Sequence, residues 1–221
     1  SRLRSIENLY VCSVFSHLAG SDDPELDEFT LQQAEVFSQC ASKISSAFDY
    51  PIIRHIANSS AIKRHPGVQF DMVRLGIGLY GVSPDQEEQL LLQPVSTLKS
   101  IISQIKTIPA GETIGYSRAW KVEQETKIGI VPLGYADGLR RILGNGKGHL
   151  LFNDKLVPII GNVNMDMIMI HINGIDAREG DEVIVFGNGR PIAGLAAEMQ
   201  TIPYEILTGI SQRVKRVYFE E

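Results

Sequence analysis

Residues 9–19, LYVCSVFSHLA, form a nearly continuous apolar run that is rich in residues favouring β-strands. Such a run is typical of a strand buried on both faces, as in a parallel sheet. The next segment, 30–48, places apolar side chains at helical spacing from Leu31 to Phe48. Residues 51–57, PIIRHIA, predict a second strand. Strand, helix and strand in this order predict parallel pairing and an α/β fold.

Two more elements extend the α/β part. The stretch NSSA at 58–61 predicts the start of a short helix, because Asn58 or Ser59 is a natural N-cap. Residues 70–81, FDMVRLGIGLYG, predict a third strand that ends in glycines. A polar stretch at 83–89 then separates this part from a region of different character.

The second region is β-rich, with strands separated by Gly, Asn and Asp turns. Strands are predicted at 95–108, 127–135, 155–163, 166–172, 181–187 and 213–219, and helices near 193–200 and 203–210. We therefore expect two domains, residues 1–90 and residues 91–221. Neither matches a complete α/β barrel, which typically needs about 250 residues.

The overall composition narrows the function classes. Of 221 residues, 43% are hydrophobic and 21% are charged, which favours a globular fold with a buried core. The net charge of −5 argues against a general nucleic-acid binder, which normally carries a basic face. The sequence has no apolar run near the roughly 18 residues of a membrane span, and its first residues lack a signal-peptide pattern. Cys12 and Cys40 form no CxxC pair, so we expect neither a disulfide framework nor structural zinc, and a cytoplasmic location.

Polar residues follow both predicted strands of the α/β part. His17 ends the first strand, and barrel active sites lie at the carboxyl ends of parallel strands. A structural histidine is the alternative. Asn58 and Ser59 follow the second strand, where free backbone amides and a hydroxyl suit a phosphate, although an ordinary helix cap has the same pattern. The histidines lack paired ligand spacing, so no metal site is predicted.

Arg74 interrupts the apolar run at 70–81. A buried arginine needs hydrogen-bonding partners, so Arg74 forms either a structural ion pair or a ligand contact. Gly76 and Gly78 permit a close approach of the backbone at this point, or only relieve packing.

Two tyrosines in the β-rich region, Tyr116 and Tyr135, each follow a glycine at a turn. A tyrosine acts as a base only if its pKa falls well below the usual value of about 10, and otherwise it is a packing residue. Met165 and Asp166 interrupt strand residues, as in an ordinary turn. The residues by themselves thus predict an α/β plus β protein with a candidate anion site.

Seven short segments, taken in order across nearly the whole chain, resemble the alanine racemase family, which comprises fold-type III enzymes that use pyridoxal 5′-phosphate. The segments are SHLA (16–19), HIANSSA (55–61), FDMVRLGIGLYG (70–81), GYSRAW (115–120), PLGYADGLRR (132–141), GNVNMDM (161–167) and IPYEILTGISQRV (202–214). The resemblance implies the C-terminal half of a TIM-type α/β barrel followed by a β-rich C-terminal domain. It also implies a bacterial enzyme that interconverts L- and D-alanine to supply peptidoglycan precursors.

The resemblance assigns contacts to the cofactor. Asn58 and Ser59 match a strand-end motif in which the serine binds the cofactor phosphate. Gly76 and Ile77 would add backbone amides to that phosphate, and Tyr204 would add its hydroxyl.

The resemblance also assigns catalytic residues. Arg74 matches the arginine that faces the pyridine nitrogen, and an arginine keeps its own proton. His17 matches the histidine that links this arginine to the catalytic tyrosine. Tyr116 matches that tyrosine, which takes the α-proton from the L-enantiomer.

The resemblance further implies a homodimer with shared active sites. Tyr135 and Met165 match residues near the substrate carboxylate and the active-site entrance, and Asp166 accompanies Met165 in its motif. In this family, Tyr116, Tyr135 and Met165 serve the active site of the partner subunit. The expected partners are a small amino-acid substrate and a second copy of the chain, with no nucleic acid and no membrane.

One family feature has no match in this sequence. The family carries its Schiff-base lysine, which is also the second base, in a KANAYG-like motif on the first barrel strand. No lysine of this chain has that context, so we interpret the chain as a fragment that is inactive by itself. Smaller departures are Asn162 in place of a basic residue, Asn164 in place of a smaller one, and GYS in place of SYG around Tyr116. The alternatives are a related racemase for another amino acid such as serine, or a non-catalytic module for dimerisation or interaction.

Overall fold

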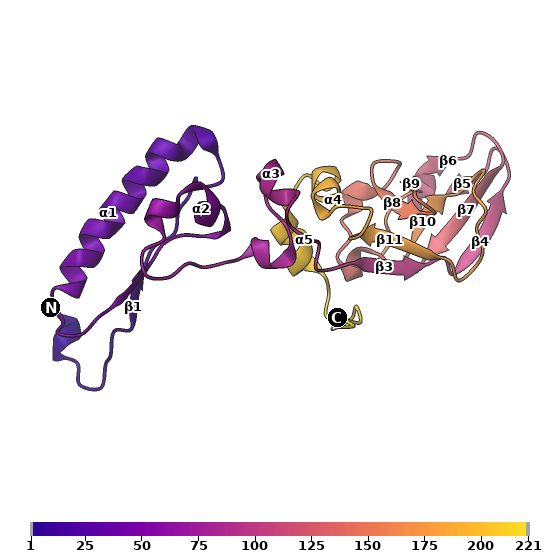
Figure 1. The fold of residues 1–221 in the computed structure, drawn as a ribbon. Coiled ribbons are helices and arrows are strands. Elements are labelled where there is room, and N and C mark those ends of the chain that lie inside the picture. Colours follow the sequence, from indigo (N-terminus) through magenta and orange to yellow (C-terminus); the bar gives the residue numbers. More distant parts are fainter. Residues whose placement is uncertain (1, 220–221) are drawn as a thin grey trace. The chain divides into compact units, whose positions relative to one another are not determined.

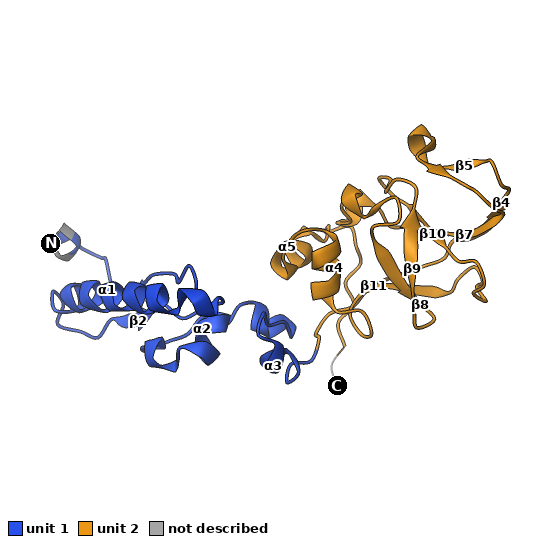
Figure 2. Cartoon of the chain, turned by 90° about the horizontal axis from the view of Figure 1, so that it is seen from above, with its two compact units in different colours: residues 1–93 blue, residues 94–221 orange. Residues whose placement is uncertain are grey.

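The chain folds into two compact units, Ser1–Gln93 and Pro94–Glu221, which we call unit 1 and unit 2 (Figure 2). The structure is a computed structural model and describes residues 2–219 (Figure 1). Within that range, no helix is both long enough and apolar enough to cross a bilayer.

Unit 1 is built on two short parallel strands. Strand β1 (Ser13–Phe15) pairs with β2 (Ile53–His55), which confirms the parallel pairing predicted from the order of elements. Besides the long helix α1 (Asp27–Ser45), the helices of unit 1 are α2 (Ser59–Arg64), α3 (Gln86–Gln89) and the 3-10 helices Arg2–Ser5, Pro24–Leu26, Pro66–Val68 and Ile77–Tyr80. Its core consists of Leu18, Ala34, Phe37, Ala41, Ile56, Ala57, Ala61 and Val68.

Helix α1 connects the two strands and packs its stripe of apolar side chains against them. Two acidic residues in its first turn and Lys43 in its last turn complement the helix dipole. Ala34, Phe37 and Ala41 are buried, as their spacing predicts. Leu31 is exposed, and Thr30 takes the buried position one residue earlier.

Two strand predictions for unit 1 are wrong in part. The run at 9–19 is not buried on both faces, because β2 is the one strand beside β1 among residues 2–219 and Phe15 is 65% exposed. Residues 72–76 form no regular strand, and the chain enters a 3-10 helix at Ile77. The amides of Asp71 and Arg74 nevertheless donate to carbonyls of the β2 region, at 3.1 Å to Arg54 O and 2.9 Å to Ala57 O.

Unit 2 contains a seven-stranded antiparallel sheet in the order β3-β11-β8-β9-β10-β7-β4. Its strands are β3 (Leu98–Ile101), β4 (Gln104–Ile108), β7 (Thr126–Val131), β8 (His149–Phe152), β9 (Lys155–Ile160), β10 (Ile168–His171) and β11 (Glu182–Phe186). Strands β5 (Thr113–Ile114) and β6 (Trp120–Lys121) form a separate hairpin. The helices are α4 (Ile192–Glu198), α5 (Pro203–Gly209) and the 3-10 helices Tyr116–Arg118, Tyr135–Asp137 and Arg141–Leu143.

The segment predicted as one strand at 95–108 is two strands, β3 and β4, at opposite edges of the sheet. The chain crosses between them at Ile102 and Ser103, whose amides bond to Asp181 O and Ile130 O at 2.8 Å each. Because one stretch of chain joins both edges, the sheet curls around a core of fully buried aliphatic side chains. The strand prediction for 213–219 is wrong. This segment, which the structure describes, begins in a turn at 212–214 and continues without regular structure.

Candidate active site

Arg74 lies at the carboxyl ends of β1 and β2, among acceptors that the parallel pairing brings together. Its Nη1 lies 2.7 Å from His55 Nδ1 and donates to His55 O at 3.2 Å. Its Nη2 donates to Ser16 O at 2.7 Å and lies 3.3 Å from His17 Nδ1. These acceptors are carbonyls and imidazoles, so the guanidinium is held in place while its positive charge stays available to a ligand.

The two histidines beside Arg74 are held as acceptors. A guanidinium has only donors, so each Nδ1 accepts a hydrogen bond and each neutral ring carries its proton on Nε2. Burial, followed by the charge of Arg74, lowers the pKa of His55 below its ordinary value. His55 was not predicted as a site residue from the sequence. Its place near the carboxyl end of the strand predicted at 51–57 was a signal that could have identified it.

Asn58 and Ser59 form the corner between β2 and α2. Asn58 is the N-cap of α2, with its Oδ1 accepting from Ala61 N at 3.1 Å and from Ser21 Oγ at 2.9 Å. The helix-cap interpretation of Asn58 is therefore confirmed. The Ser59 hydroxyl has a different environment, because it faces the glycine segment at 76–78.

The Ser59 hydroxyl and two glycine amides form a small set of polar groups. Ser59 Oγ accepts from Gly76 N at 2.8 Å and from Gly78 N at 3.4 Å. Ile77 lies between the two glycines with its side chain buried. A Cβ on Gly78 would lie 3.8 Å from Ser59 Oγ and only 2.9 Å from Leu75 Cδ1. The Ser59 hydroxyl accepts from both glycine amides and still has its own proton to donate, so this corner, with Arg74 in the same segment, suits an anion such as a phosphate.

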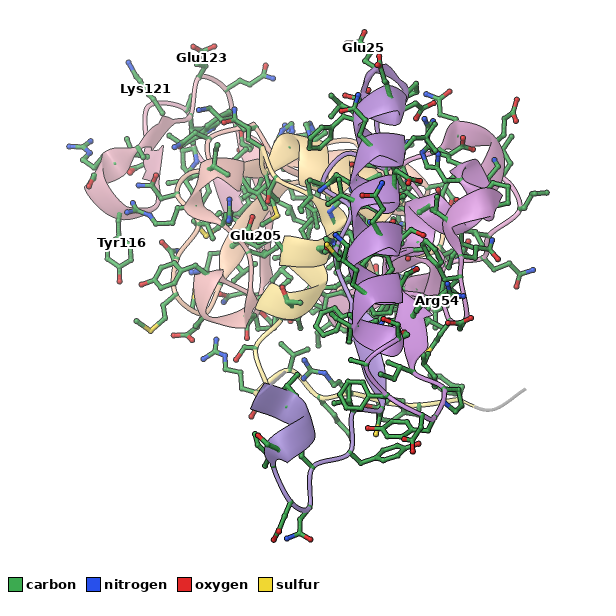
Figure 3. The ribbon with its side chains drawn as sticks, turned by 90° about the vertical axis from the view of Figure 1, so that its left-hand side faces the viewer. Glu25, Arg54, Tyr116, Lys121, Glu123 and Glu205 are labelled. Carbon is green, nitrogen blue, oxygen red and sulfur yellow. The ribbon has the colours of Figure 1, made fainter. Side chains whose placement is uncertain are left out.

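Tyr116 is presented at the tip of the β5–β6 hairpin. The turn bends sharply, because φ is +82° at Gly115 and +61° at Ser117. Asn162 Nδ2 donates to Tyr116 O at 3.0 Å and so ties the turn to the segment after β9. The tyrosine is 75% exposed and its phenol projects away from the ribbon (Figure 3).

Tyr135 and Met165 are brought together in unit 2. Tyr135 N donates to Asn164 O at 2.9 Å, and Ala136 N donates to Met165 O at 3.1 Å. Only glycine fits at 134, because a Cβ there would lie 2.3 Å from Met165 O. The side chains of Tyr135 and Met165 are both exposed.

Asp137 and Arg213 are site residues that sequence reasoning missed. Arg213 forms a two-point contact with Asp137, with Nε at 2.7 Å from Oδ1 and Nη2 at 3.0 Å from Oδ2, and it also reaches Asp166 Oδ1 at 2.8 Å. Burial by itself raises the pKa of Asp137, but hydrogen bonds from Arg213 and Gly134 N hold that pKa below its ordinary value. Both residues lie within the quoted segments at 132–141 and 202–214, but nothing in the sequence indicated that they pair.

Tyr204 is the second residue of α5 and is partly exposed. Its neighbour Glu205 forms an ion pair with Arg140 and accepts a hydrogen bond from Thr201. These contacts fix the start of α5 against the loop that carries Tyr135.

The fold and these residues define a class of protein: a partial α/β barrel with polar groups at its strand ends, followed by a β-rich domain. The comparisons with known proteins make the assignment specific. Residues 95–218 match the family model described as alanine racemase, C-terminal domain, and residues 1–84 match the model described as alanine racemase, N-terminal domain. The chain belongs to the alanine racemase family, which confirms the resemblance and the fold class inferred from its sequence.

Individual relatives agree with the family models. The chain is 38% identical over 223 residues to alanine racemase 2 of Caldanaerobacter subterraneus subsp. tengcongensis, an alignment that covers 98% of this chain and 57% of that protein. Alanine racemase of Clostridium difficile 630 in complex with cycloserine matches with a TM-score of 0.88 and 36% identity, over 96% of this chain and 57% of that one. Alanine racemase of Bartonella henselae with covalently bound pyridoxal phosphate gives a TM-score of 0.83 and 31% identity, over 94% and 56%. The chain thus spans somewhat more than half the length of these relatives.

Proposed function

We propose that this chain is the part of a pyridoxal 5′-phosphate-dependent alanine racemase that binds the phosphate and pyridine ring and presents the catalytic tyrosine. The enzyme would interconvert L- and D-alanine for peptidoglycan precursors. The observation that carries the proposal is the Arg74 cluster, because a fixed guanidinium lies in the same short segment as the Ser59–Gly76 contact. When bound, the cofactor supplies an electron sink for the carbanion at the substrate Cα.

The residues of unit 1 fit the two ends of the cofactor. The Ser59 hydroxyl and the backbone amides of Gly76 and Ile77 would hold its phosphate, with Asn58 fixing the start of α2. Arg74 would direct an N–H toward the pyridine nitrogen. Because arginine keeps its proton, the ring nitrogen accepts a hydrogen bond without being protonated. The Tyr204 hydroxyl of unit 2 would complete the phosphate contacts.

Racemisation needs one base on each face of Cα, because a proton leaves one face and returns to the other. We assign Tyr116 as the base for the L-enantiomer, since its phenol is exposed on a tightly turned tip. A tyrosine gives up its proton near neutral pH only if positive charge or hydrogen bonds favour the phenolate. His17, held next to Arg74, is the proposed source of that bias and would act on Tyr116 of the partner subunit.

The other assignments concern the substrate and the assembly. Tyr135 and Met165 would lie near the substrate carboxylate and the entrance, with Asp166 beside Met165. We further propose a homodimer in which Tyr116, Tyr135 and Met165 serve the partner's active site. The base for D-alanine is a lysine that this chain does not supply, so the chain by itself is expected to be inactive.

The test compares the chain with a chimera. In the chimera, the chain follows the part of a full-length family member that carries the Schiff-base lysine. The chain alone should show no turnover of L-alanine, and after borohydride reduction with pyridoxal phosphate no single lysine should carry a stoichiometric adduct. The chimera should racemise L-alanine faster than L-serine. A folded, dimeric chimera without activity would refute the proposed function, and a fast L-serine reaction would favour a serine racemase.

A variant of the chimera tests the tyrosine. Tyr116→Phe removes one hydroxyl, and losing a general base typically slows a reaction by about 10²–10⁴-fold. In deuterated water, exchange of the α-proton should be lost for L-alanine while D-alanine still exchanges measurably faster. Tyr218→Phe, at a highly exposed position near the C-terminus, is the matched control. Equal loss from both enantiomers with cofactor still bound would show that Tyr116 is not the face-specific base.

A further inference from the structure

Asp137 occupies an unusual position for an acidic residue. Among the described residues, it is the only carboxylate that is buried, at 7% exposure. It accepts from Gly134 N at 2.8 Å and from two nitrogens of Arg213 at 2.7 and 3.0 Å. A buried carboxylate is costly unless it is paired and fully hydrogen-bonded, so these three contacts hold the short 3-10 helix Tyr135–Asp137 in one geometry.

Arg213 extends the contact to a second loop. Its Nη2 also donates to Asp166 Oδ1 at 2.8 Å, next to Met165. The backbone of Asp137 takes part as well, because its carbonyl accepts from Ser211 N at 3.2 Å. Three separate stretches of unit 2 therefore meet at one guanidinium. Hydrogen bonds to Asp137 and then to Asp166 raise the pKa of Arg213, so the bridge stays charged over the whole physiological range.

Two loops joined in this way carry two side chains of the proposed site. The exposed side chains of Tyr135 and Met165 have little packing to fix them, so their positions depend on the backbone beneath. Two hydrogen bonds hold that backbone, one from Tyr135 N to Asn164 O and one from Ala136 N to Met165 O. Both lie directly beside the charged contacts. A shift of Asp137 or Asp166 therefore moves Tyr135 or Met165.

The charges argue against direct binding of substrate by this cluster. Two carboxylates, Asp137 and Asp166, face one guanidinium, so the cluster carries a net negative charge. An amino-acid carboxylate is repelled by such a cluster. The cluster's effect on substrate must therefore pass through the neighbouring side chains.

We propose that Asp137 and Arg213 are positioning residues, which hold Tyr135 and Met165 where these meet the substrate carboxylate. The assignment of that carboxylate rests on the proposed function, whereas the positioning of the two loops does not. Neither Asp137 nor Arg213 touches substrate or cofactor in this scheme.

The first experiment uses this chain and measures amide hydrogen exchange. Arg213→Lys keeps the charge but loses the two-point fork, so exchange at Gly134, Tyr135 and Ala136 should accelerate by about 10-fold. Amides of β8 and β9 should keep their rates, which reports that the fold is intact. Lys215→Gln, at an exposed position two residues along the chain, is the matched control and should leave all these rates unchanged.

A second variant separates the two arms of the bridge. Asp166→Asn keeps the shape of the side chain but removes its charge, and the contact between Asp137 and Arg213 remains. Exchange should then accelerate more at Ala136, which bonds to Met165 O, than at Gly134, which bonds to Asp137. Unchanged exchange at 134–136 in both variants would overturn the positioning of the loops.

The second experiment uses the chimera and asks whether Arg213 acts through Tyr135. Arg213→Lys should raise KM for alanine by about 10-fold with a smaller change in kcat, as expected for lost orientation of the carboxylate. In a Tyr135→Phe background the same change should raise KM by only about 2-fold, because residues that act as one unit are not additive. Equal effects in both backgrounds would overturn the link to substrate. A chimera that is inactive before any substitution would instead refute the proposed function, while hydrogen exchange still decides the positioning of the loops.

Discussion

Two phenylalanines on strands show how differently the units are built. Phe15 of β1 in unit 1 is 65% exposed, whereas Phe152 of β8 in unit 2 is 1% exposed. Unit 1 has two short strands under one long helix, and its site residues are held by polar contacts at the strand ends. Unit 2 has seven strands around a buried aliphatic core, and its site residues stand on loops fastened to that frame. Site geometry in unit 2 therefore depends on its large core, whereas site geometry in unit 1 depends on local polar contacts at the strand ends.

The largest expected effect comes from separating the units. Residues 94–221 produced alone should unfold cooperatively, with a Tm within about 5 °C of the transition that unit 2 shows in the whole chain. Residues 1–93 alone should self-associate and lack a cooperative transition, because their parallel strand edges are uncovered. Calorimetry and sedimentation on both pieces provide the measurement. A monomeric, cooperatively melting 1–93 would contradict the comparison.

The two phenylalanines give a smaller, local test. Phe152→Ala should lower the free energy of unfolding of unit 2 by about 3–5 kcal/mol, because it leaves a cavity in a closed core. Phe15→Ala should change stability by less than about 1 kcal/mol, since the ring largely faces solvent and contacts the His55 ring and the Arg74 guanidinium. Denaturant titrations of the whole chain, followed by signals assigned to each unit, measure both. Equal losses for the two variants would show that Phe15 is packed as tightly as Phe152 and would contradict the comparison.

Local patterns explain why much of unit 1 and four strands of unit 2, β7, β9, β10 and β11, were predictable, whereas β5, β6 and β8 were not predicted. Helix α1 follows from apolar spacing, and the cap at Asn58 follows from one side chain and the amide of Ala61. Both depend on residues close together in the sequence. The parallel pairing of β1 and β2 also follows from the order of elements, because two parallel strands need a long crossover connection and a helix between them provides it.

The failures have a shared physical cause, which is contact between distant residues. The bend at Ile102–Ser103 depends on carbonyls of Asp181 and Ile130, far along the chain, so the segment appeared to be one strand. The pairing of Asp137 with Arg213 likewise joins residues whose local sequences carry no signal of each other. The exposure of β1 depends on how many strands and helices pack beside it. An apolar run in the sequence does not specify the number of these neighbours.

The smallest expected effect is a pH dependence confined to unit 1. Burial, and then the charge of Arg74, lowers the pKa of His55 in the folded state below its ordinary value of about 6.5. The unfolded state therefore takes up the proton first, so the stability that His55 contributes is full above about pH 6.5 and is lost as the pH falls through the lower folded pKa. The slope for a single proton is at most about 1.4 kcal/mol per pH unit.

Amide exchange measured between pH 7.5 and 5 tests this, after correction for the intrinsic pH dependence of exchange. The opening free energy at Ile56 and Ala57, which follow His55 in the unit 1 core, should fall on acidification. His55→Gln keeps an acceptor for Arg74 but does not titrate, so the slope at these amides should flatten. Ile159 in β9 gives the reference for unit 2, and the substitution should leave its profile unchanged. An unaltered slope at Ile56 and Ala57 in His55→Gln would mean that another group causes the acid sensitivity of unit 1.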